Sequence, residues 1–299
     1  MFQVVTVQPD AANLPEQLGS KLKFWYEDKQ RLYKQVQGET GEDWSEKIAS
    51  ELCRILGIPH AHYELALWKG QRGVVSQTFI PQGGRLVHGN ELLARIVQDY
   101  PAKKSFRVHQ HTLGRVLAIM RAVKPPLEFE PSTDIRTAQD VFVGYLMLDA
   151  WIANQDRHHE NWGLVLTKDK IVHLAPSFDH ASSLARNIRD EERRDRLTTK
   201  DQNRSIERYV ERALSAFYIS EDADKPLSTL DAFLFAAKFR AQAALSWLKK
   251  LETVSPKETE SLFHEVGVDR ISPIAIEFAQ KMLVLNKERL LTCVETLIK

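Results

Sequence analysis

The sequence predicts an α+β fold of two lobes, in which a small β-rich lobe with one helix precedes a larger, mainly helical lobe. Three observations predict it. β-Branched and aromatic residues form short strand-like segments up to about residue 80, a single helical pattern interrupts them, and helical periodicity dominates the rest of the chain. We therefore place an N-terminal lobe with an antiparallel sheet at residues 1–80 and a C-terminal lobe at residues 81–299.

In the first lobe, each element has its own local signal. The segment "FQVVTV" is β-branched, and "KFWYED" and "RLYKQV" predict two paired strands joined by a polar turn at residues 27–30. Residues 41–56 predict a helix that ends at Gly57, because apolar residues recur at helical spacing, namely Trp44, Ile48, Leu52 and Ile55. The segments "HYELALW" and "RGVVSQTFI" predict a second strand pair around Lys69 and Gly70.

The second lobe is mostly helical by periodicity, with helices predicted at residues 90–99, 110–123, 137–153, 228–251 and 271–298. Between these helices, "GLVL" and "IVHL" flank the polar turn "TKDK" and predict a β-hairpin. Residues 187–212 are dense in both signs of charge and contain few large apolar residues. They predict a mobile or surface segment.

The bulk composition excludes several classes of protein. With 41 basic and 40 acidic residues the formal net charge is +1, so we expect neither direct nucleic-acid binding nor attraction to a membrane surface. No apolar run approaches the roughly 18 residues that a membrane-spanning helix needs, and no signal peptide is recognisable. Cys53 and Cys293 lie in apolar-periodic segments and are expected to be free, buried thiols. These features favour a cytoplasmic location.

The most informative stretch is "NQDRHHENWG", which follows the apolar segment "VFVGYLMLDAWI". It places Asp156 five residues before Asn161, the predicted hairpin comes next, and Asp179 follows in "PSFDHASSL". Phosphoryl transfer from ATP needs one carboxylate to orient the attacking hydroxyl, and oxygen ligands to hold Mg²⁺ against the phosphates. The Asp-to-Asn offset is that of the protein-kinase catalytic loop. The order of these elements therefore predicts a catalytic loop, with the hairpin returning Asp179 to Asn161.

A kinase also needs a lysine on a strand of the small lobe and an acid on a helix to position it. Lys34 shares a strand face with Leu32 and Val36, because side chains alternate along a strand. A lysine on an apolar face is typical of a cleft in which it reaches the phosphates of ATP. The acid could be Glu46 or Glu51, which flank the apolar stripe of the helix on opposite sides.

Each of these residues also has a simpler interpretation. Asp156 and Asp179 taken singly could be cap or turn residues, Lys34 a solvent-exposed strand lysine, and Glu46 a surface residue of its helix. A zinc site at the local histidines is disfavoured, because no cysteine lies nearby and their spacing fits no common zinc motif; these are His158, His159, His173 and His180. Ser20, Ser182 and Ser183 are candidate phosphorylation sites, although capping or turn roles are favoured.

Four segments in this order, "GEDWSEKIASELCRILGIPHAHYELA", "FIPQGGRLVHGNELL", "NQDRHHENWG" and "PSFDHASSL", resemble the HipA-like kinase family. Members of that family have a protein-kinase-like fold and include bacterial toxin kinases that phosphorylate proteins on serine or threonine. The Asp-Arg-His-x-x-Asn pattern is also similar to that of phosphatidylinositol 3/4-kinases. The resemblance extends over most of residues 17–186 and is weaker in the C-terminal helices.

The resemblance assigns expected roles to the residues of the catalytic loop. It implies that Asp156 is the catalytic carboxylate, that Asn161 and Asp179 bind Mg²⁺, and that His158 donates to the γ-phosphate. Lys34 is expected to contact the ATP phosphates.

For the rest of the nucleotide site, counting back from Gly57 favours Glu46 as the helix acid. The backbone of Gln77 and Phe79 is expected to bind adenine. Gly19 and Ser20 lie where the phosphate-covering loop belongs, although the sequence departs from the kinase pattern here, because no G-x-G-x-x-G is present.

The function implied is that of an ATP- and Mg²⁺-dependent kinase that phosphorylates serine or threonine of a protein substrate, in a toxin–antitoxin system or outside one. A small-molecule or lipid kinase, or a nucleotide-binding pseudokinase acting as an interaction module, remain alternatives. Compared with full-length toxin members, the chain lacks an extra N-terminal segment, which leaves open whether a small partner protein supplies it. A DNA-binding antitoxin is a further expected partner.

Overall fold

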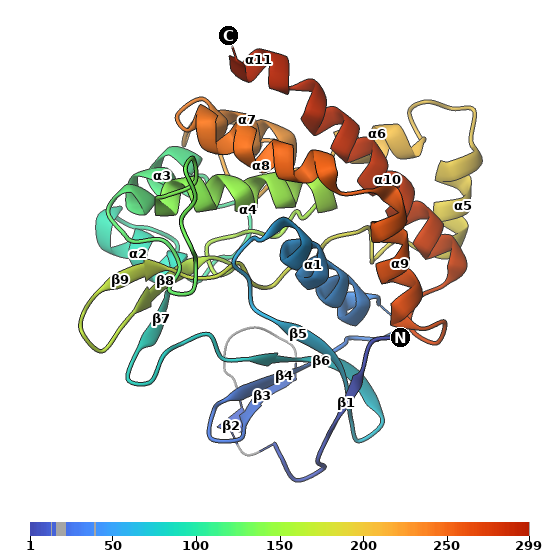
Figure 1. Ribbon diagram of the computed structural model, residues 1–299, viewed down its shortest axis with the longest axis horizontal. Coiled ribbons are helices and arrows are strands. Elements are labelled where there is room, and N and C mark those ends of the chain that lie inside the picture. Colours follow the sequence, from blue (N-terminus) through green and yellow to red (C-terminus); the bar gives the residue numbers. More distant parts are fainter. Residues whose placement is uncertain (13, 16–21, 39, 299) are drawn as a thin grey trace.

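The computed structural model describes residues 1–12, 14–15, 22–38 and 40–298. In this part of the chain, a six-stranded sheet lies at one end of the molecule, most helices pack at the other end, and a three-stranded sheet lies between them on one side (Figure 1). The predicted α+β class, with a small β-rich lobe and a larger helical lobe, is confirmed. The boundary at residue 80 stays a prediction.

The six-stranded sheet has the order β1-β5-β6-β4-β3-β2, formed by β1 (Val4–Val7), β2 (Leu14–Pro15), β3 (Lys23–Tyr26), β4 (Arg31–Gln35), β5 (Tyr63–Trp68) and β6 (Gln71–Gln77). Both predicted strand pairs, β3–β4 and β5–β6, are present, and the strands of each pair run antiparallel. The exception is β1, which pairs with β5 in parallel. At the β5–β6 turn Gly70 has a φ of 76°, a conformation that glycine adopts without strain.

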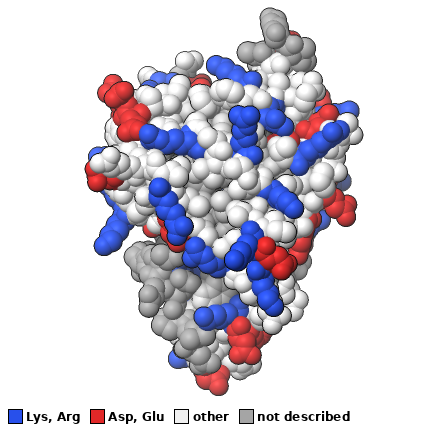
Figure 2. Space-filling model, turned by 90° about the vertical axis from the view of Figure 1, so that its left-hand side faces the viewer, with Lys and Arg blue, Asp and Glu red and all other residues white. Residues whose placement is uncertain are grey.

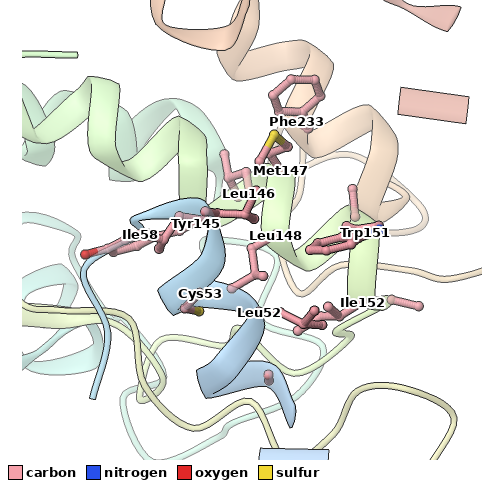
Figure 3. Packing of buried hydrophobic residues seen from close by; sticks show 14 of the residues in the cluster. Leu52, Cys53, Ile58, Tyr145, Leu146, Met147, Leu148, Trp151, Ile152 and Phe233 are labelled. Atoms are coloured by element: carbon pink, nitrogen blue, oxygen red, sulfur yellow. The ribbon is translucent and has the colours of Figure 1, made fainter. Parts of the chain in front are cut away.

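The helix of the small lobe, α1 (Glu42–Leu56), begins after Gly41 and ends at Gly57, which has a φ of 68° and forms the left-handed cap that the sequence predicts. The helix packs on β5 and β6 of the sheet, and its buried face also belongs to the core of the helical lobe. Leu52 and Cys53 are completely buried in the largest core of the molecule, against side chains of α4 (Ala138–Ile152) (Figure 3). The helix therefore connects the small lobe firmly to the helical lobe.

The helical lobe is built around α4, whose residues are buried along the whole helix because neighbours cover it on several sides. These neighbours are α7 (Thr229–Ala237), α8 (Ala241–Thr253), α10 (Pro273–Thr292) and α3 (Leu113–Arg121). The remaining helices are α2 (Gly89–Ile96), α5 (Asp190–Thr198), α6 (Ile206–Glu211), α9 (Pro256–Val266) and α11 (Val294–Ile298).

Two long helices predicted from periodicity are each divided in the structure. The helix expected at 228–251 is interrupted at residues 238–240 and forms α7 and α8. Arg240 lies in this interruption, and its Nε donates a hydrogen bond to Asp140 Oδ1 of α4. Trp247 Nε1 of α8 donates to the backbone carbonyl of Asp140 at 2.8 Å. Packing of both segments on α4 thus decides the break. The helix expected at 271–298 is divided into α10 and α11 at Cys293.

Residues 187–212 are more ordered than their composition indicates, because they contain α5 and α6. Arg193 is buried and donates to the carbonyl of Ala185 at 3.0 Å, which anchors α5 despite its polar sequence.

The helix α9 was not predicted, yet its start has a sequence signal. Ser255 and Glu258 form a capping box around a proline at the first helical position.

The predicted hairpin is confirmed as β8 (Gly163–Leu166) and β9 (Val172–Leu174), and β7 (Arg85–His88) adds a third strand that the sequence analysis placed outside any element. Beneath it, a small apolar cluster connects the two sheets, with Tyr63 and Val74 from the large sheet against Val165 and Phe178. This cluster lies between the six-stranded sheet and the loops that carry the polar motif of residues 154–163 and Asp179.

The contact between α4 and α8 leaves no room for a side chain at Gly144. A Cβ atom there would lie 2.5 Å from Trp247. We expect Gly144→Ala to lower the free energy of unfolding by about 1–3 kcal/mol, because overpacking outweighs the better helix propensity of alanine. Gly114→Ala, on the exposed face of α3 with no atom within 4 Å of the added Cβ, should instead be neutral or stabilising. Urea unfolding of both variants measures this, and equal effects would contradict it.

Candidate active site

The predicted site residues meet in one cleft. A cleft of about 450 Å³ lies between the six-stranded sheet and the loop that follows α4, and it is lined by Lys34, Glu46, Gln77, Phe79, Asp156, His158, Asn161 and Asp179. They come from β4, α1, the end of β6 and the two loops that flank the β8–β9 hairpin. Gly19 and Ser20, assigned to a phosphate-covering loop, lie outside the described residues.

The loop after α4 is shaped by hydrogen bonds between its own polar residues. The backbone N–H of Asp156 donates to Asn154 Oδ1 at 3.2 Å, and Asn161 Nδ2 donates to the Asp156 carbonyl at 2.7 Å. Because the amide nitrogen of Asn161 is used in this way, its oxygen Oδ1 is the atom that could bind a cation. Ser182 Oγ donates a hydrogen bond to Asp156 Oδ2 at 3.1 Å, so this carboxylate already accepts a hydrogen bond from a hydroxyl of the chain.

A buried polar network holds this loop in place. Arg157 forms a bidentate ion pair with Asp149 of α4, and its Nη2 also donates to Ser177 Oγ at 3.0 Å. Ser177 Oγ lies 2.6 Å from His180 Nε2, and the backbone N–H of His180 donates to Glu46 Oε1 at 2.7 Å. The network therefore connects α4, the loop that follows it, the segment around Asp179 and α1.

The sequence analysis did not identify this network. Asp149 has one weak signal, which is that it is an acidic residue in an otherwise apolar helix and therefore needs a buried partner. Burial is the largest single influence and lowers the pKa of Arg157, but the charge and hydrogen bonds of Asp149, together with Tyr145 and Cys53, raise it above its ordinary value. The guanidinium thus stays charged inside the protein.

Lys34 and Asp179 face each other across the cleft, with 3.4 Å between Nζ and Oδ1. Burial lowers the pKa of Lys34, whereas Asp179, Tyr63 and Glu46 raise it, and the net result is a raised pKa. Lys34 therefore pairs with Asp179, while Glu46 influences it at longer range. Asp179 has a φ of 59°, a strained backbone conformation of the kind found at functional sites.

Of the two acids that the sequence left open on α1, only Glu46 lines the cleft. Glu51 instead pairs with Lys47 at 2.8 Å and with Arg54 at 2.8 Å, away from the cleft. The geometry therefore agrees with the choice that the family resemblance implies, although its role in binding ATP stays a prediction.

The histidines of the motif do not converge on one point. His158 faces the cleft, with its Nε2 3.6 Å from Asp156 Oδ1. His159 contacts Tyr100, His173 contacts the carbonyl of Pro125, and His180 belongs to the buried network. Within the described ranges no group of three or more His, Cys, Asp or Glu side chains is arranged to hold a metal ion. Each histidine thus has a separate structural environment.

Beside the loop that follows α4, His111 is buried and makes two hydrogen bonds. Its Nε2 accepts from Trp162 Nε1 at 3.0 Å, and its Nδ1 lies 3.0 Å from the carbonyl of Ala216. Burial is the main cause that lowers the pKa of His111 to about 3. A neutral ring that donates through Nδ1 and accepts through Nε2 satisfies both partners.

The chemistry of the lining fits a nucleotide with a divalent cation. Apolar side chains from the sheet, Leu32 and Val74, and the ring of Phe79 occupy one part of the lining. The other part has carboxylate and amide oxygens, at Asp179 and Asn161, which are the hard ligands that Mg²⁺ prefers. An apolar cleft with a few convergent polar groups is typical of a small-molecule site.

No protein-family model and no curated protein matches the sequence. Several solved structures are similar in fold, among them two bacterial proteins. The proinflammatory kinase CtkA of Helicobacter pylori has a TM-score of 0.69 at 20% identity, and the match covers 93% of this chain and 90% of that chain. HipA of Shewanella oneidensis MR-1, solved with HipB and its operator DNA, has a TM-score of 0.57 at 12% identity, covering 95% of this chain and 67% of that chain.

At these identities the similarity shows the fold, and the protein-kinase-like fold predicted from the motifs is confirmed. Both neighbours fit the HipA-like resemblance of the sequence. None of the described helices has the length and apolar character that crossing a membrane requires.

Removing one partner of the buried ion pair should be costly. We expect Arg157→Met to lower the free energy of unfolding by about 3–5 kcal/mol, because Asp149 would be left charged and unpaired in the core. Arg204→Met removes an exposed pair with Asp195 and should cost at most about 1 kcal/mol. Urea unfolding of both variants measures the two losses of unfolding free energy. A similar loss in the two variants would contradict this prediction.

His111 should make the protein less stable in acid. His111 binds a proton with a pKa near 6.5 in the unfolded state and with a pKa of about 3 in the folded state. The contribution of neutral His111 to stability is therefore complete above pH 6.5 and is lost as the pH decreases towards 3. We expect the loss of unfolding free energy between pH 7 and pH 5 to be smaller in His111→Gln by about 2 kcal/mol. Equal losses in the two proteins, by urea unfolding at both pH values, would contradict this.

Proposed function

We propose that the protein is an ATP- and Mg²⁺-dependent kinase that transfers the γ-phosphoryl group to a serine or threonine hydroxyl of a protein. The observation that carries this proposal is the position of Asp156. Its carboxylate accepts a hydrogen bond from the hydroxyl of Ser182 at 3.1 Å. The same cleft contains Lys34 and the side-chain oxygens of Asn161 and Asp179. The kinase fold of the similar CtkA structure supports it.

In the proposed reaction, Asp156 orients the acceptor hydroxyl and accepts its proton. Lys34 binds the α- and β-phosphates, and His158 donates a hydrogen bond to the γ-phosphate. Asn161 and Asp179 would hold Mg²⁺, which supplies charge neutralisation between the phosphates. Glu46, fixed by the backbone N–H of His180, restrains the segment that carries Asp179.

The backbone at Gln77 and Phe79, where β6 ends and the chain leaves the sheet, is proposed to bind adenine. The phosphate-covering role of Gly19 and Ser20 belongs to the same proposal.

The proposal extends to a regulated, cytoplasmic kinase. The HipA structure that this chain resembles was solved with HipB and operator DNA. By this similarity, the protein is proposed to act as the kinase of a toxin–antitoxin pair, with a small partner protein that restrains it. The acceptor is proposed to be a protein, although the nucleotide half of the site would serve a lipid or small-molecule kinase equally well.

The test is ATP·Mg²⁺ binding by calorimetry, combined with transfer of labelled phosphate to the protein itself and to dephosphorylated casein. Asp156→Asn should lower transfer by about 10³-fold while ATP is still bound, because the positioned base is lost. Asp179→Asn should lose Mg²⁺-dependent binding of ATP.

The matched control is Asp169→Asn, in the exposed turn between β8 and β9, which should keep full activity. If the unaltered protein bound no ATP·Mg²⁺, the nucleotide interpretation of the cleft would be wrong. If it bound ATP·Mg²⁺ but Asp156→Asn transferred phosphate as fast as the unaltered protein, the assigned base would be wrong.

A further inference from the structure

The loop between α2 and α3, residues 101–108, touches the catalytic loop at two points. Ser105 Oγ donates to Glu160 Oε2 at 3.0 Å, and the rings of Phe106 and His158 meet edge to face with 5.5 Å between their centroids. Ser105 and Phe106 both line the cleft. Since His158 Nε2 lies 3.6 Å from Asp156 Oδ1, this loop borders the place that the acceptor hydroxyl must reach.

The loop is held at both ends and within its turn. The residues at its two ends, Tyr100 and Val108, are buried, and Tyr100 Oη lies 2.6 Å from a ring nitrogen of His159. Asn90 of α2 donates from its side chain to the carbonyl of Ala102 at 3.1 Å. The surface that the loop presents is therefore set by buried anchors close to the catalytic loop.

The outward-facing side chains of this loop are three cations and one aromatic ring. Lys103, Lys104 and Arg107 are exposed, and within the described part of the chain none of them has an ion pair or a side-chain hydrogen bond. Phe106 is 65% exposed although it lines the cleft. An exposed aromatic ring flanked by unpaired cations is typical of a binding surface rather than of a structural loop.

The charge of the loop is continued over the neighbouring surface. Residues 81–125 contain eight Lys or Arg and two Asp or Glu, whereas the whole chain has a net charge of +1. Figure 2 looks onto the side of the molecule where α2 and α3 lie in Figure 1, and Lys and Arg side chains are spread over this face, with Asp and Glu mostly towards its margins. On this face Arg115 is paired with Glu221, and Glu160 beside Ser105 is an acid of the cleft rim, so the cations of the loop itself carry the positive charge that is available to a ligand.

We propose that residues 101–108 form the acceptor subsite and that the substrate is a protein whose target serine or threonine is flanked by acidic side chains. This inference rests on the proposed kinase function and deepens it. Lys103, Lys104 and Arg107 would pair with the flanking carboxylates, and Phe106 would pack on an apolar part of the bound segment. Complementary charge at the rim contributes specificity and rapid association.

A protein ligand fits this surface better than a nucleic acid. Besides Phe106, Ile96 at the end of α2 is 62% exposed on the same segment, and mixed apolar and cationic side chains are typical of protein interfaces. Nucleic-acid binding depends mainly on extensive contact of cations with phosphates.

The experiment measures binding of two fluorescent peptides by anisotropy. Each has one central serine, flanked by Asp and Glu in the first and by Asn and Gln in the second. The test variant combines Lys103→Glu, Lys104→Glu and Arg107→Glu. The control variant makes the same charge change at three exposed lysines of α8, α9 and α10, namely Lys249→Glu, Lys257→Glu and Lys281→Glu. Thermal unfolding verifies that both variants are folded.

We expect the unaltered protein to bind the acidic peptide about tenfold tighter than the neutral one at low salt, and the difference to shrink at about 0.5 M salt. The loop variant should lose this preference, and the control variant should keep it. With ATP·Mg²⁺, kcat/KM for phosphorylation of the two peptides should follow the same order. Phe106→Ala should weaken binding of both peptides, because an apolar contact does not depend on their charge.

Equal binding of the two peptides by the unaltered protein, or equal losses in the two triple variants, would overturn the inference. A short single-stranded RNA that bound more tightly than the acidic peptide, and lost affinity only in the loop variant, would assign the surface to nucleic acid instead. Anisotropy does not depend on ATP. Failure of the kinase proposal would therefore appear separately, as absence of ATP·Mg²⁺ binding in calorimetry.

Discussion

The buried ion pair between Arg157 and Asp149 is the interaction on which the cleft depends. Arg157 lies between Asp156 and His158 in the chain, so fixing its guanidinium against α4 also fixes the backbone of both neighbours. The cost of burying two charges is high and is recovered only when both are paired and hydrogen-bonded. Here Asp149 also accepts from Asn154 Nδ2 at 2.8 Å, which satisfies the carboxylate further. The pair is thus a geometric constraint as much as a source of stability.

Different apolar clusters position the two sides of the cleft. Glu46 belongs to α1, which shares the largest core with α4, so it is fixed relative to Asp156. Lys34 belongs to the sheet, which meets the hairpin through a smaller apolar cluster that includes Val74 and Phe178. Because α1 also packs on β5 and β6, the helix that carries Glu46 contacts both the sheet and the helical lobe.

Local patterns predicted much of the fold and most of the cleft. The strand pairs, α1 and its cap at Gly57, and the β8–β9 hairpin all follow from residue periodicity and turn chemistry over short distances. The breaks in the long helices did not follow, because contacts such as that of Trp247 with the Asp140 carbonyl decide them. The strand β7 was missed for a similar reason, since its pairing partner β8 lies far along the chain.

For the site, the motif around Asp156 and Asn161 and the later Asp179 were recognisable from the sequence, because their spacing is set by one loop and one hairpin. The sequence by itself, through these motifs and the family resemblance, predicted that these groups would lie close to Lys34, and they line one cleft with it. Only the tertiary structure decided that Glu46 and not Glu51 lines that cleft, that Arg157 pairs with Asp149, and that the loop at 101–108 borders it. The physical reason is that local spacing fixes which residues can be neighbours along the chain, whereas the orientation of α1 and the burial of charged partners depend on the packing of the whole core.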